Sequence, residues 1–155
     1  MKHPLHLLSS QIFAIVWAVT SVFLGWGALC IITGSKYPIM VVTSESMEPA
    51  FQRGDLIFLW NREKTIHTGD IPVIWIPGNP LPMVHRVITV NHELETDGHL
   101  KQMILTKGDN NAIDDSFMYL PGRPFALREE VVGLVRGYVP KLGWASLVVQ
   151  GGFRR

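Results

Sequence analysis

The feature that most constrains this chain is a long uncharged stretch near its N-terminus. No charged residue occurs from Ile12 to Thr33, where the sequence reads IFAIVWAVTSVFLGWGALCIIT. A helix needs about 20 mostly apolar residues to cross a hydrocarbon core of roughly 30 Å. The stretch therefore predicts one membrane-spanning helix over 12–33, preceded by a short N-terminal segment, 1–11.

Two other interpretations of this stretch are open. A buried core helix of a soluble protein is the least favoured, because so long a run without charge is unusual in such a helix. A cleaved signal peptide would have a shorter apolar centre of about 7–15 residues, although Ala28 and Cys30 mimic a small-residue cleavage site. We expect an uncleaved anchor. Lys2 and the amino terminus stand against Lys36 alone, which favours a cytosolic N-terminus.

The rest of the chain indicates a mainly β domain over 34–140. Short apolar or alternating runs are separated by Gly, Pro, Asn and Asp turn signals, a pattern typical of antiparallel sheets. From 141 to 155 an apolar tail with small residues closes the chain; it is too short to cross a bilayer, and we expect it to associate with the membrane surface. The expected strands are 39–42, 56–60, 71–76, 83–90, 102–106 and 129–139, the last of them one strand or a pair.

Charge and cysteine content exclude several classes of protein. The formal net charge is +1 with histidines neutral, which gives no electrostatic argument for nucleic-acid binding. The single cysteine, Cys30, rules out an internal disulfide framework. Two pairs of closely spaced histidines lack the cysteines or carboxylates that zinc sites use. We therefore expect no metal and no nucleic-acid partner.

Two serines follow the apolar run that begins at Ile39. Ser44 and Ser46 flank Glu45 and are followed by Pro49. In an extended segment side chains alternate, so both hydroxyls would project to one face and Glu45 to the other. Such a pair can supply a nucleophile and a helper donor. A polar turn is the more ordinary interpretation of the spacing alone.

A histidine and two aspartates could complete a catalytic set with these serines. A serine hydroxyl is a weak nucleophile unless a base accepts its proton, and the base works best when a third group fixes its tautomer. His85 lies on a predicted strand and is the candidate base, although a lone strand histidine is more often a hydrogen-bonded core or surface residue. Asp109 and Asp115 are candidates for the third group, with stabilisation of the turn itself as the alternative.

In this order, these segments resemble the successive boxes of the type I signal peptidases. The resemblance is specifically to the catalytic subunits of the endoplasmic-reticulum signal peptidase complex. It is carried by Ser44-Glu45-Ser46-Met47-Glu48-Pro49, His85-Arg86-Val87 and Gly108-Asp109-Asn110-Asn111 with Asp114-Asp115, and it extends through 50–62 and 131–140.

The resemblance implies a serine endopeptidase whose protease domain is an antiparallel β-sheet or coiled β-barrel. It assigns Ser46 as the nucleophile, His85 as the general base and Asp115 as the aspartate that completes the triad. Asp109 matches a second important aspartate, and Ser44 matches the hydroxyl that joins the Ser46 N–H in an oxyanion hole. Ser-His-Asp chemistry requires no cofactor.

The resemblance also implies a location, substrates and partners. We expect a single-pass protein of the endoplasmic-reticulum membrane with its catalytic domain in the lumen. Its substrates would be preproteins entering the secretory pathway, cut after small side chains at the first and third positions before the scissile bond. Accessory membrane subunits and the lipid bilayer are the expected partners.

Two departures from the family leave alternatives open. Glu45 replaces the usual glycine, and if that position required a positive φ the turn would be strained. A catalytically impaired paralogue that serves as a structural or binding subunit is therefore the alternative. The tail is also shorter than in relatives with a longer apolar C-terminus. A Ser-Lys enzyme using Lys107 is a second alternative, against which Lys107 reads as a solvated turn residue.

Overall fold

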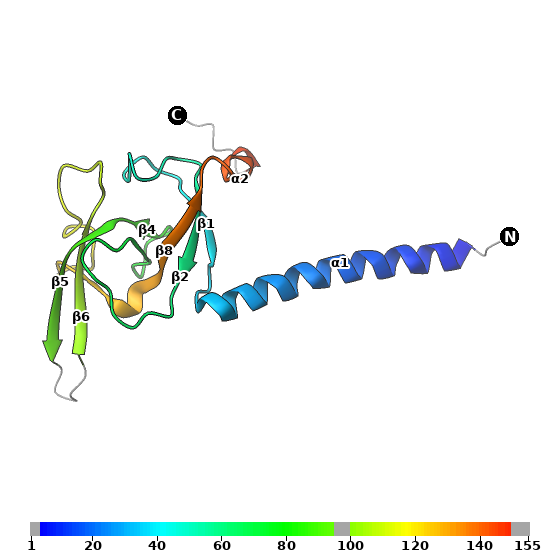
Figure 1. The fold of residues 1–155 in the computed structure, drawn as a ribbon, viewed down its shortest axis with the longest axis horizontal. Helices are drawn as coiled ribbons and strands as arrows, with labels where there is room; N and C mark the ends of the chain where they lie inside the picture. The colour runs from blue at the N-terminus through cyan, green and yellow to red at the C-terminus, as the bar shows by residue number, and fades with distance from the viewer. Residues whose placement is uncertain (1–3, 95–99, 150–155) are drawn as a thin grey trace. The chain divides into compact units, whose positions relative to one another are not determined.

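A computed structural model gives the structure of residues 4–94 and 100–149. The chain divides into two compact units, Met1–Ile32 and Thr33–Arg155. The first is a helix and the second is a β domain, and each is described by itself (Figure 1). This organisation agrees with the predicted fold class, an apolar N-terminal helix followed by mostly antiparallel sheets.

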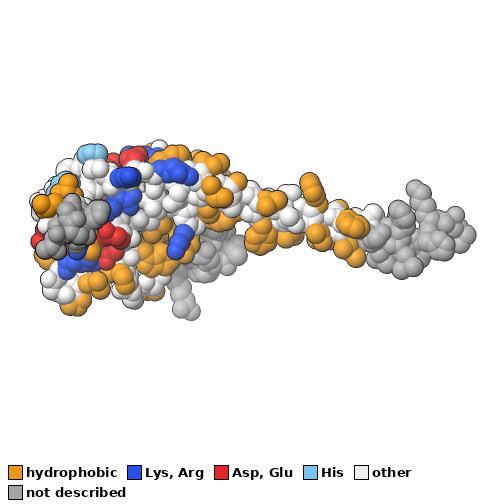
Figure 2. All heavy atoms as spheres, turned by 90° about the horizontal axis from the view of Figure 1, so that it is seen from below, with side chains coloured by type: hydrophobic (Ala, Val, Ile, Leu, Met, Phe, Trp, Pro, Cys, Tyr) orange, Lys and Arg blue, Asp and Glu red, His pale blue; other side chains and the backbone are white. Residues whose placement is uncertain are grey.

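Helix α1 runs over Pro4–Thr33 and so begins before the uncharged stretch does. A proline suits the start of a helix, where its missing N–H is not needed. The span Ser10–Thr33 is long and apolar enough to cross a membrane, and its apolar side chains are exposed rather than buried against protein (Figure 2). An apolar helix exposed on all sides fits a lipid environment, where its own backbone bonds satisfy every polar group.

The second unit is built from short strands, and every pairing between them is antiparallel. One sheet has the order β1-β2-β8-β3-β4, so that β1 and β4 form its two edges. The other has the order β5-β6-β7. Figure 1 shows the β5–β6 hairpin on the side of the domain away from β1. The strands are β1 (Ile39–Val41), β2 (Leu56–Trp60), β3 (Pro72–Ile74), β4 (Met83–Val84), β5 (Arg86–Leu94), β6 (Leu100–Lys107), β7 (Ala126–Leu127) and β8 (Val131–Val139).

Two clusters of buried apolar side chains hold the sheets together. The first includes Met47 and Phe51, which come from the turn after β1 and pack with Ile57 and Leu59 of β2. Full burial of such a side chain is worth roughly 1.5–3 kcal/mol, so this turn is anchored rather than loose. The second cluster joins both sheets and contains Ile66, Ile74, Ile76, Val87, Ile104, Tyr119, Ala126, Val131 and Leu134.

The prediction of one continuous strand over 83–90 is wrong, because the chain passes from one sheet to the other at His85. Val84 pairs with Val73 in the first sheet, whereas Arg86 pairs with Lys107 in the second. A residue at such a crossing lies outside both ladders. His85 therefore sits at a break between strands, with its ring free to bond to other side chains.

Other boundaries also differ from the sequence expectations: β1 ends at Val41 rather than at 42, β3 covers only Pro72–Ile74 of the expected 71–76, and β6 extends beyond 102–106 at both ends. The predicted loop 91–99 is shorter, because β5 continues to Leu94 and β6 already begins at Leu100; residues 95–99 lie outside the described residues. The strand expected over 129–139 is single and starts at Val131, after the 3-10 turn η1 (Arg128–Glu130). Glu130 stabilises that turn by accepting the Leu127 N–H at 2.9 Å.

The tail contains a short helix, α2 (Trp144–Val149), and residues 150–155 lie outside the description. The segment before this helix is fixed by a hydrogen bond of 3.0 Å from the Lys141 N–H to the Asp55 carboxylate. Gly54 has a φ of 91°, and a Cβ there would lie 2.3 Å from the Trp144 indole nitrogen. The glycine thus permits both the backbone conformation and the close contact with α2.

Candidate active site

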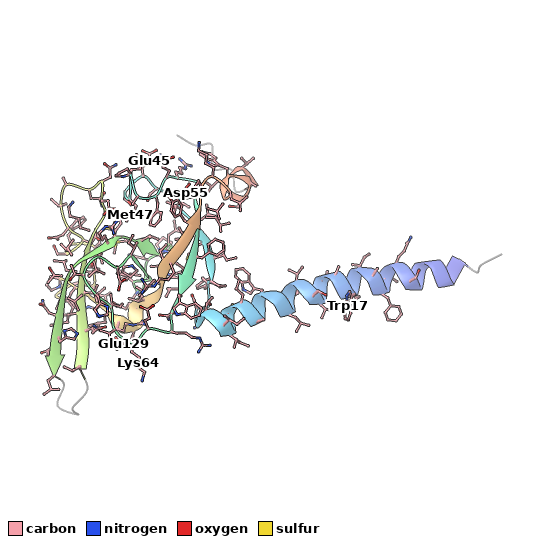
Figure 3. The ribbon with its side chains drawn as sticks, in the orientation of Figure 1. Trp17, Glu45, Met47, Asp55, Lys64 and Glu129 are labelled. Carbon is pink, nitrogen blue, oxygen red and sulfur yellow. The ribbon has the colours of Figure 1, made fainter. Side chains whose placement is uncertain are left out.

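Ser46 lies in the turn that follows β1, and two kinds of contact fix its backbone. Its neighbour Met47 is buried in the core at 2% exposure. Its carbonyl accepts the Asn110 N–H at 2.9 Å, and the Asn110 side chain donates to the Glu45 carbonyl at 3.2 Å. Figure 3 labels Glu45 and Met47 on this turn, at the upper end of the β domain. The Ser44 and Ser46 hydroxyls lie 3.1 Å apart, as expected for a pair on one side, although residues 44–50 form a bend and a turn rather than the extended segment that the sequence predicts.

The His85 ring connects this turn to a buried carboxylate. Its Nε2 lies 3.0 Å from Ser46 Oγ, and its Nδ1 lies 2.7 Å from Asp115 Oδ2. The histidine is 5% exposed and the aspartate 1% exposed. The structure thus brings together three side chains that are far apart in the sequence. Ser46 and His85 are 39 residues apart, and His85 and Asp115 are 30 residues apart.

The hydrogen-bond directions follow from the chemistry of the groups. A carboxylate only accepts, so in the neutral imidazole that can act as a base Nδ1 of His85 donates to Asp115 and Nε2 accepts. The Ser46 hydroxyl then donates its only proton to Nε2. The bond between the two serines must accordingly run from the Ser44 hydroxyl to Ser46 Oγ. This arrangement prepares the Ser46 oxygen for loss of its proton to an imidazole.

Asp115 is held from its other side by β6. Its Oδ2 also accepts the Thr106 hydroxyl at 2.6 Å, and its N–H donates to the Thr106 carbonyl at 3.0 Å. Its Oδ1 is buried and accepts no hydrogen bond from any residue between 4 and 149 that the structure describes. Burial of a carboxylate oxygen without a hydrogen-bond partner costs free energy.

Asp109 lies outside this chain of hydrogen bonds and pairs instead with Arg86. The guanidinium donates from Nε at 2.8 Å and from Nη2 at 2.6 Å, one bond to each carboxylate oxygen. The hydrogen bond to Asp109 raises the pKa of the Arg86 guanidinium above its ordinary value. Because Arg86 follows His85 and Asp109 precedes Asn110, this pair ties the histidine's segment to the turn that holds Ser46.

Gly108 allows that turn to approach the nucleophile closely. A Cβ at this position would lie 2.7 Å from the Ser46 carbonyl oxygen and 2.6 Å from the Asn111 side-chain nitrogen. Real Cβ atoms essentially never come so near a backbone atom. A glycine is therefore required here for space, and the Gly108–Asn110 turn forms a cradle around the Ser46 carbonyl.

Glu45 does not strain the turn in which it replaces the family's glycine. Among the described non-glycine residues only Lys141 has a positive φ, so Glu45 has an ordinary backbone conformation. Its side chain is exposed. The backbone requirement that would have made this substitution harmful is absent.

A cleft of about 460 Å³ opens onto the two serines and the histidine. Its walls include Met40 and Val41 of β1 and Met83 and Val84 of β4, the two edge strands of the first sheet. Most of its remaining lining is apolar. A second cavity of about 430 Å³ is lined by Tyr37, Trp75 and Glu129 among others, and none of the candidate residues borders it.

Among the described residues, the Ser46 hydroxyl is hydrogen-bonded to His85 and Ser44 rather than to Lys107. Lys107 is the last residue of β6 and lies opposite Arg86 in the strand register. The Ser46 hydroxyl is already bonded to His85. Within 4–94 and 100–149, no three His, Cys, Asp or Glu side chains gather where they could hold a metal ion.

The sequence interpretation assigned no role to three residues at or next to the candidate set. Arg86 was named only as part of the segment His85-Arg86-Val87, although it pairs with Asp109. Thr106 and Tyr119 were assigned no role, although a hydrogen bond of 2.8 Å joins their hydroxyls behind Asp115. A threonine at the end of a predicted strand, next to a polar turn, is too common a pattern to have identified them.

Comparisons with known proteins show the family to which the chain is similar. The family described as Peptidase S24-like matches residues 15–96. The chain is 43% identical over 157 residues to the signal peptidase complex catalytic subunit SEC11 of Ajellomyces capsulatus, covering 96% of this chain and 83% of the relative. It is 45% identical to SEC11 of Scheffersomyces stipitis and 41% identical to that of Komagataella phaffii, covering 90% of this chain and 82% of each relative.

Proposed function

This chain belongs to the family of signal peptidase catalytic subunits and is a serine protease of that type, and we propose that it removes N-terminal signal peptides from preproteins by a Ser46–His85–Asp115 acyl-enzyme mechanism. The observation that carries the mechanism is the continuous hydrogen-bonded chain from Ser46 Oγ through the His85 ring to Asp115 Oδ2. It supplies a nucleophile, a base and a group that fixes the base's tautomer.

The proposed reaction proceeds in two acyl transfers. Ser46 Oγ attacks the scissile carbonyl carbon while its proton passes to Nε2 of His85. The imidazolium then gives this proton to the leaving amine, the C–N bond breaks, and the signal peptide's new C-terminus remains as an ester on Ser46. A water molecule attacks the ester, His85 accepts and returns a proton, and the carboxylic acid is released.

The Ser44 hydroxyl and the Ser46 N–H are the proposed donors to the tetrahedral intermediate. At rest Ser44 donates to Ser46 Oγ at 3.1 Å. When that oxygen becomes bonded to the substrate carbon, the Ser44 hydroxyl is free to rotate toward the developing oxyanion. Donors already in place for such charge contribute a large share of catalysis in acyl transfer.

The substrate is proposed to bind as an extended strand between β1 and β4. Both are sheet edges with backbone groups available for pairing, and both border the cleft. An added strand gains main-chain hydrogen bonds while alternate side chains enter pockets. Small residues at the first and third positions before the cut are proposed to occupy the cleft next to Ser46.

The proposed location is the endoplasmic-reticulum membrane with the catalytic domain in the lumen. Helix α1 supports a single-pass anchor over 12–33, with 1–11 cytosolic, 34–140 as the catalytic domain and 141–155 as a membrane-associated tail. Such an anchor would hold the cleft near the bilayer surface, where a signal peptide's apolar segment ends. The relatives' naming as subunits of a complex supports accessory membrane subunits as partners.

Replacing Glu45 with glycine tests the alternative of a catalytically impaired subunit. We expect kcat/KM for preprotein cleavage by the assembled complex to change by less than about threefold, because exposed substitutions usually shift free energies by about 0.5 kcal/mol. The measurement compares wild type and Glu45→Gly in detergent. An inactive wild-type complex that Glu45→Gly restores by orders of magnitude would instead establish this chain as an impaired paralogue.

The two aspartates should differ sharply when each is changed to asparagine. Asp115→Asn should lower kcat on the order of 10³- to 10⁴-fold, because the amide can no longer stabilise the imidazolium and favours the wrong tautomer. Asp109→Asn should lower it by less than about tenfold, because this partly exposed side chain touches neither His85 nor Ser46. Equal losses for the two variants, with both complexes intact, would contradict the assignment of Asp115 as the orienting carboxylate.

A further inference from the structure

Thr106 forms two hydrogen bonds with Asp115. Its hydroxyl donates to Asp115 Oδ2 at 2.6 Å, and its carbonyl accepts the Asp115 N–H at 3.0 Å. Its own N–H donates to the Tyr119 hydroxyl at 3.0 Å. The hydroxyl, the carbonyl and the N–H of Thr106 are therefore all hydrogen-bonded to Asp115 or to Tyr119.

The direction of every hydrogen bond in this group is determined. Asp115 only accepts, so Thr106 spends its single hydroxyl proton on the carboxylate. The contact of 2.8 Å between the Thr106 and Tyr119 hydroxyls must then be donated by Tyr119. Burial raises the pKa of the Tyr119 phenol, which keeps that proton in place. The order of donation is Tyr119 to Thr106 to Asp115.

These residues are more deeply buried than the nucleophile they support. Thr106 has no exposed surface, and Tyr119 is 6% exposed. The loop between them also carries Asn110, which holds the Ser46 carbonyl. Thr106 and Tyr119 thus close the base of the loop that positions both ends of the catalytic chain.

The carboxylate of Asp115 depends on these bonds for its orientation. Oδ2 receives both His85 and Thr106, whereas Oδ1 receives no bond from the described part of the chain. The last torsion of an aspartate side chain has broad, weakly defined minima, so rotation is cheap unless hydrogen bonds oppose it. Without the Thr106 hydroxyl, the one remaining hydrogen bond to the carboxylate from the described residues would be that of His85.

We propose that Thr106 and Tyr119 are positioning residues for the catalytic aspartate, so that turnover depends on them although neither contacts the substrate. The inference rests on the Ser46–His85–Asp115 mechanism proposed above. It predicts an effect on kcat rather than on KM, because the cleft that binds the substrate includes neither residue.

The test uses the assembled membrane complex carrying Thr106→Val, Thr106→Ser or Tyr119→Phe, with Ser46→Ala in parallel. Thr106→Val preserves shape and should lower kcat about 10- to 100-fold, because hydrogen bonds to charged groups are worth about 1.5–3 kcal/mol. Tyr119→Phe should lower kcat about 3- to 10-fold, the range expected for loss of a neutral bond. KM should change by less than about twofold in both.

Two comparisons separate positioning from general loss of structure. Thr106→Ser restores the hydroxyl and should keep at least about a third of wild-type kcat, within the range of a mild substitution. Thr89→Val makes the same chemical change at an exposed site on β5 and should leave kcat unaltered. Thermal unfolding of each complex gives the folded fraction by which kcat is normalised.

Other results would refute either the positioning role of Thr106 and Tyr119 or the proposed mechanism. Full kcat in Thr106→Val, or equal losses in Thr106→Val and Thr106→Ser, would refute the positioning role while leaving the proposed mechanism intact. A rise in KM at unchanged kcat would also refute it. Cleavage that persists in Ser46→Ala would refute the mechanism itself, and the positioning role with it.

Discussion

Ser46→Ala is expected to abolish preprotein cleavage, lowering kcat on the order of 10⁴- to 10⁶-fold. The physical reason is that Ser46 Oγ is the only hydroxyl bonded to the His85 ring among the described residues. Ser44 Oγ lies 3.1 Å away but is bonded to Ser46 rather than to the imidazole. The measurement is single-turnover cleavage of a preprotein by the purified complex, followed by gel analysis.

The control for this substitution removes a hydroxyl elsewhere. Ser146→Ala deletes a hydroxyl that donates to the Gly143 carbonyl at 2.9 Å, at the start of α2. It should cleave at the wild-type rate. The Ser46→Ala complex should assemble normally, since the contact from Asn110 uses the backbone carbonyl of residue 46. Residual cleavage within about tenfold of wild type would remove Ser46 as the nucleophile.

His85→Ala is expected to have an effect of the same order, on the order of 10⁴- to 10⁶-fold in kcat. The ring is the only group that links the serine oxygen to the buried carboxylate in the described structure. Members of a catalytic unit are strongly non-additive, so the double variant Ser46→Ala/His85→Ala should be no slower than either single one. Single-turnover rates of the three variants measure this directly.

Lys107→Ala is the matched control, because a Ser-Lys enzyme would reverse the result. In that case Lys107→Ala would abolish turnover and His85→Ala would spare it. Lys107 ends β6 opposite Arg86, and the Ser46 hydroxyl is bonded to His85, so we expect the removal of Lys107 to be tolerated. A complex that retains activity without His85 but loses it without Lys107 would overturn the proposed base.

Much of the fold class could be predicted from local sequence. The uncharged run over 12–33 and the short apolar runs between turn signals are features that a single helix and antiparallel strands impose on neighbouring residues. The Ser44–Ser46 spacing indicated hydroxyls on one side, and they lie 3.1 Å apart. These features depend on residues close together in the chain, which is why they are legible without a structure.

The parts that escaped prediction depend on distant segments. His85 was placed within one alternating strand, but the chain leaves one sheet and enters another there, and no local signal marks such a crossing. Gly108 is needed because the Ser46 carbonyl lies against it, 62 residues away by the numbering. Thr106 contacts Asp115 and Tyr119 only because a later turn returns both to the end of β6.

The effect of Glu45 could not be judged from the sequence, because it depends on the backbone conformation at that position. From sequence, the loss of the family's glycine raised the prospect of strain at the nucleophile. The described backbone requires no positive φ at that position, and the side chain is exposed. A glycine is needed where φ is positive or where a Cβ would clash with a neighbour. Gly54 and Gly108 meet one or both of these conditions, whereas residue 45 does not have a positive φ.

In the proposed mechanism an acyl group is transferred to the Ser46 oxygen. To detect it, the assembled complex is incubated with a peptide ester that ends in a small residue and quenched in acid during turnover, and the modified residue is mapped by mass spectrometry. We predict an acyl adduct on Ser46 in the wild type and none in Ser46→Ala. An adduct on another residue, or continued turnover of the ester in Ser46→Ala, would contradict the account.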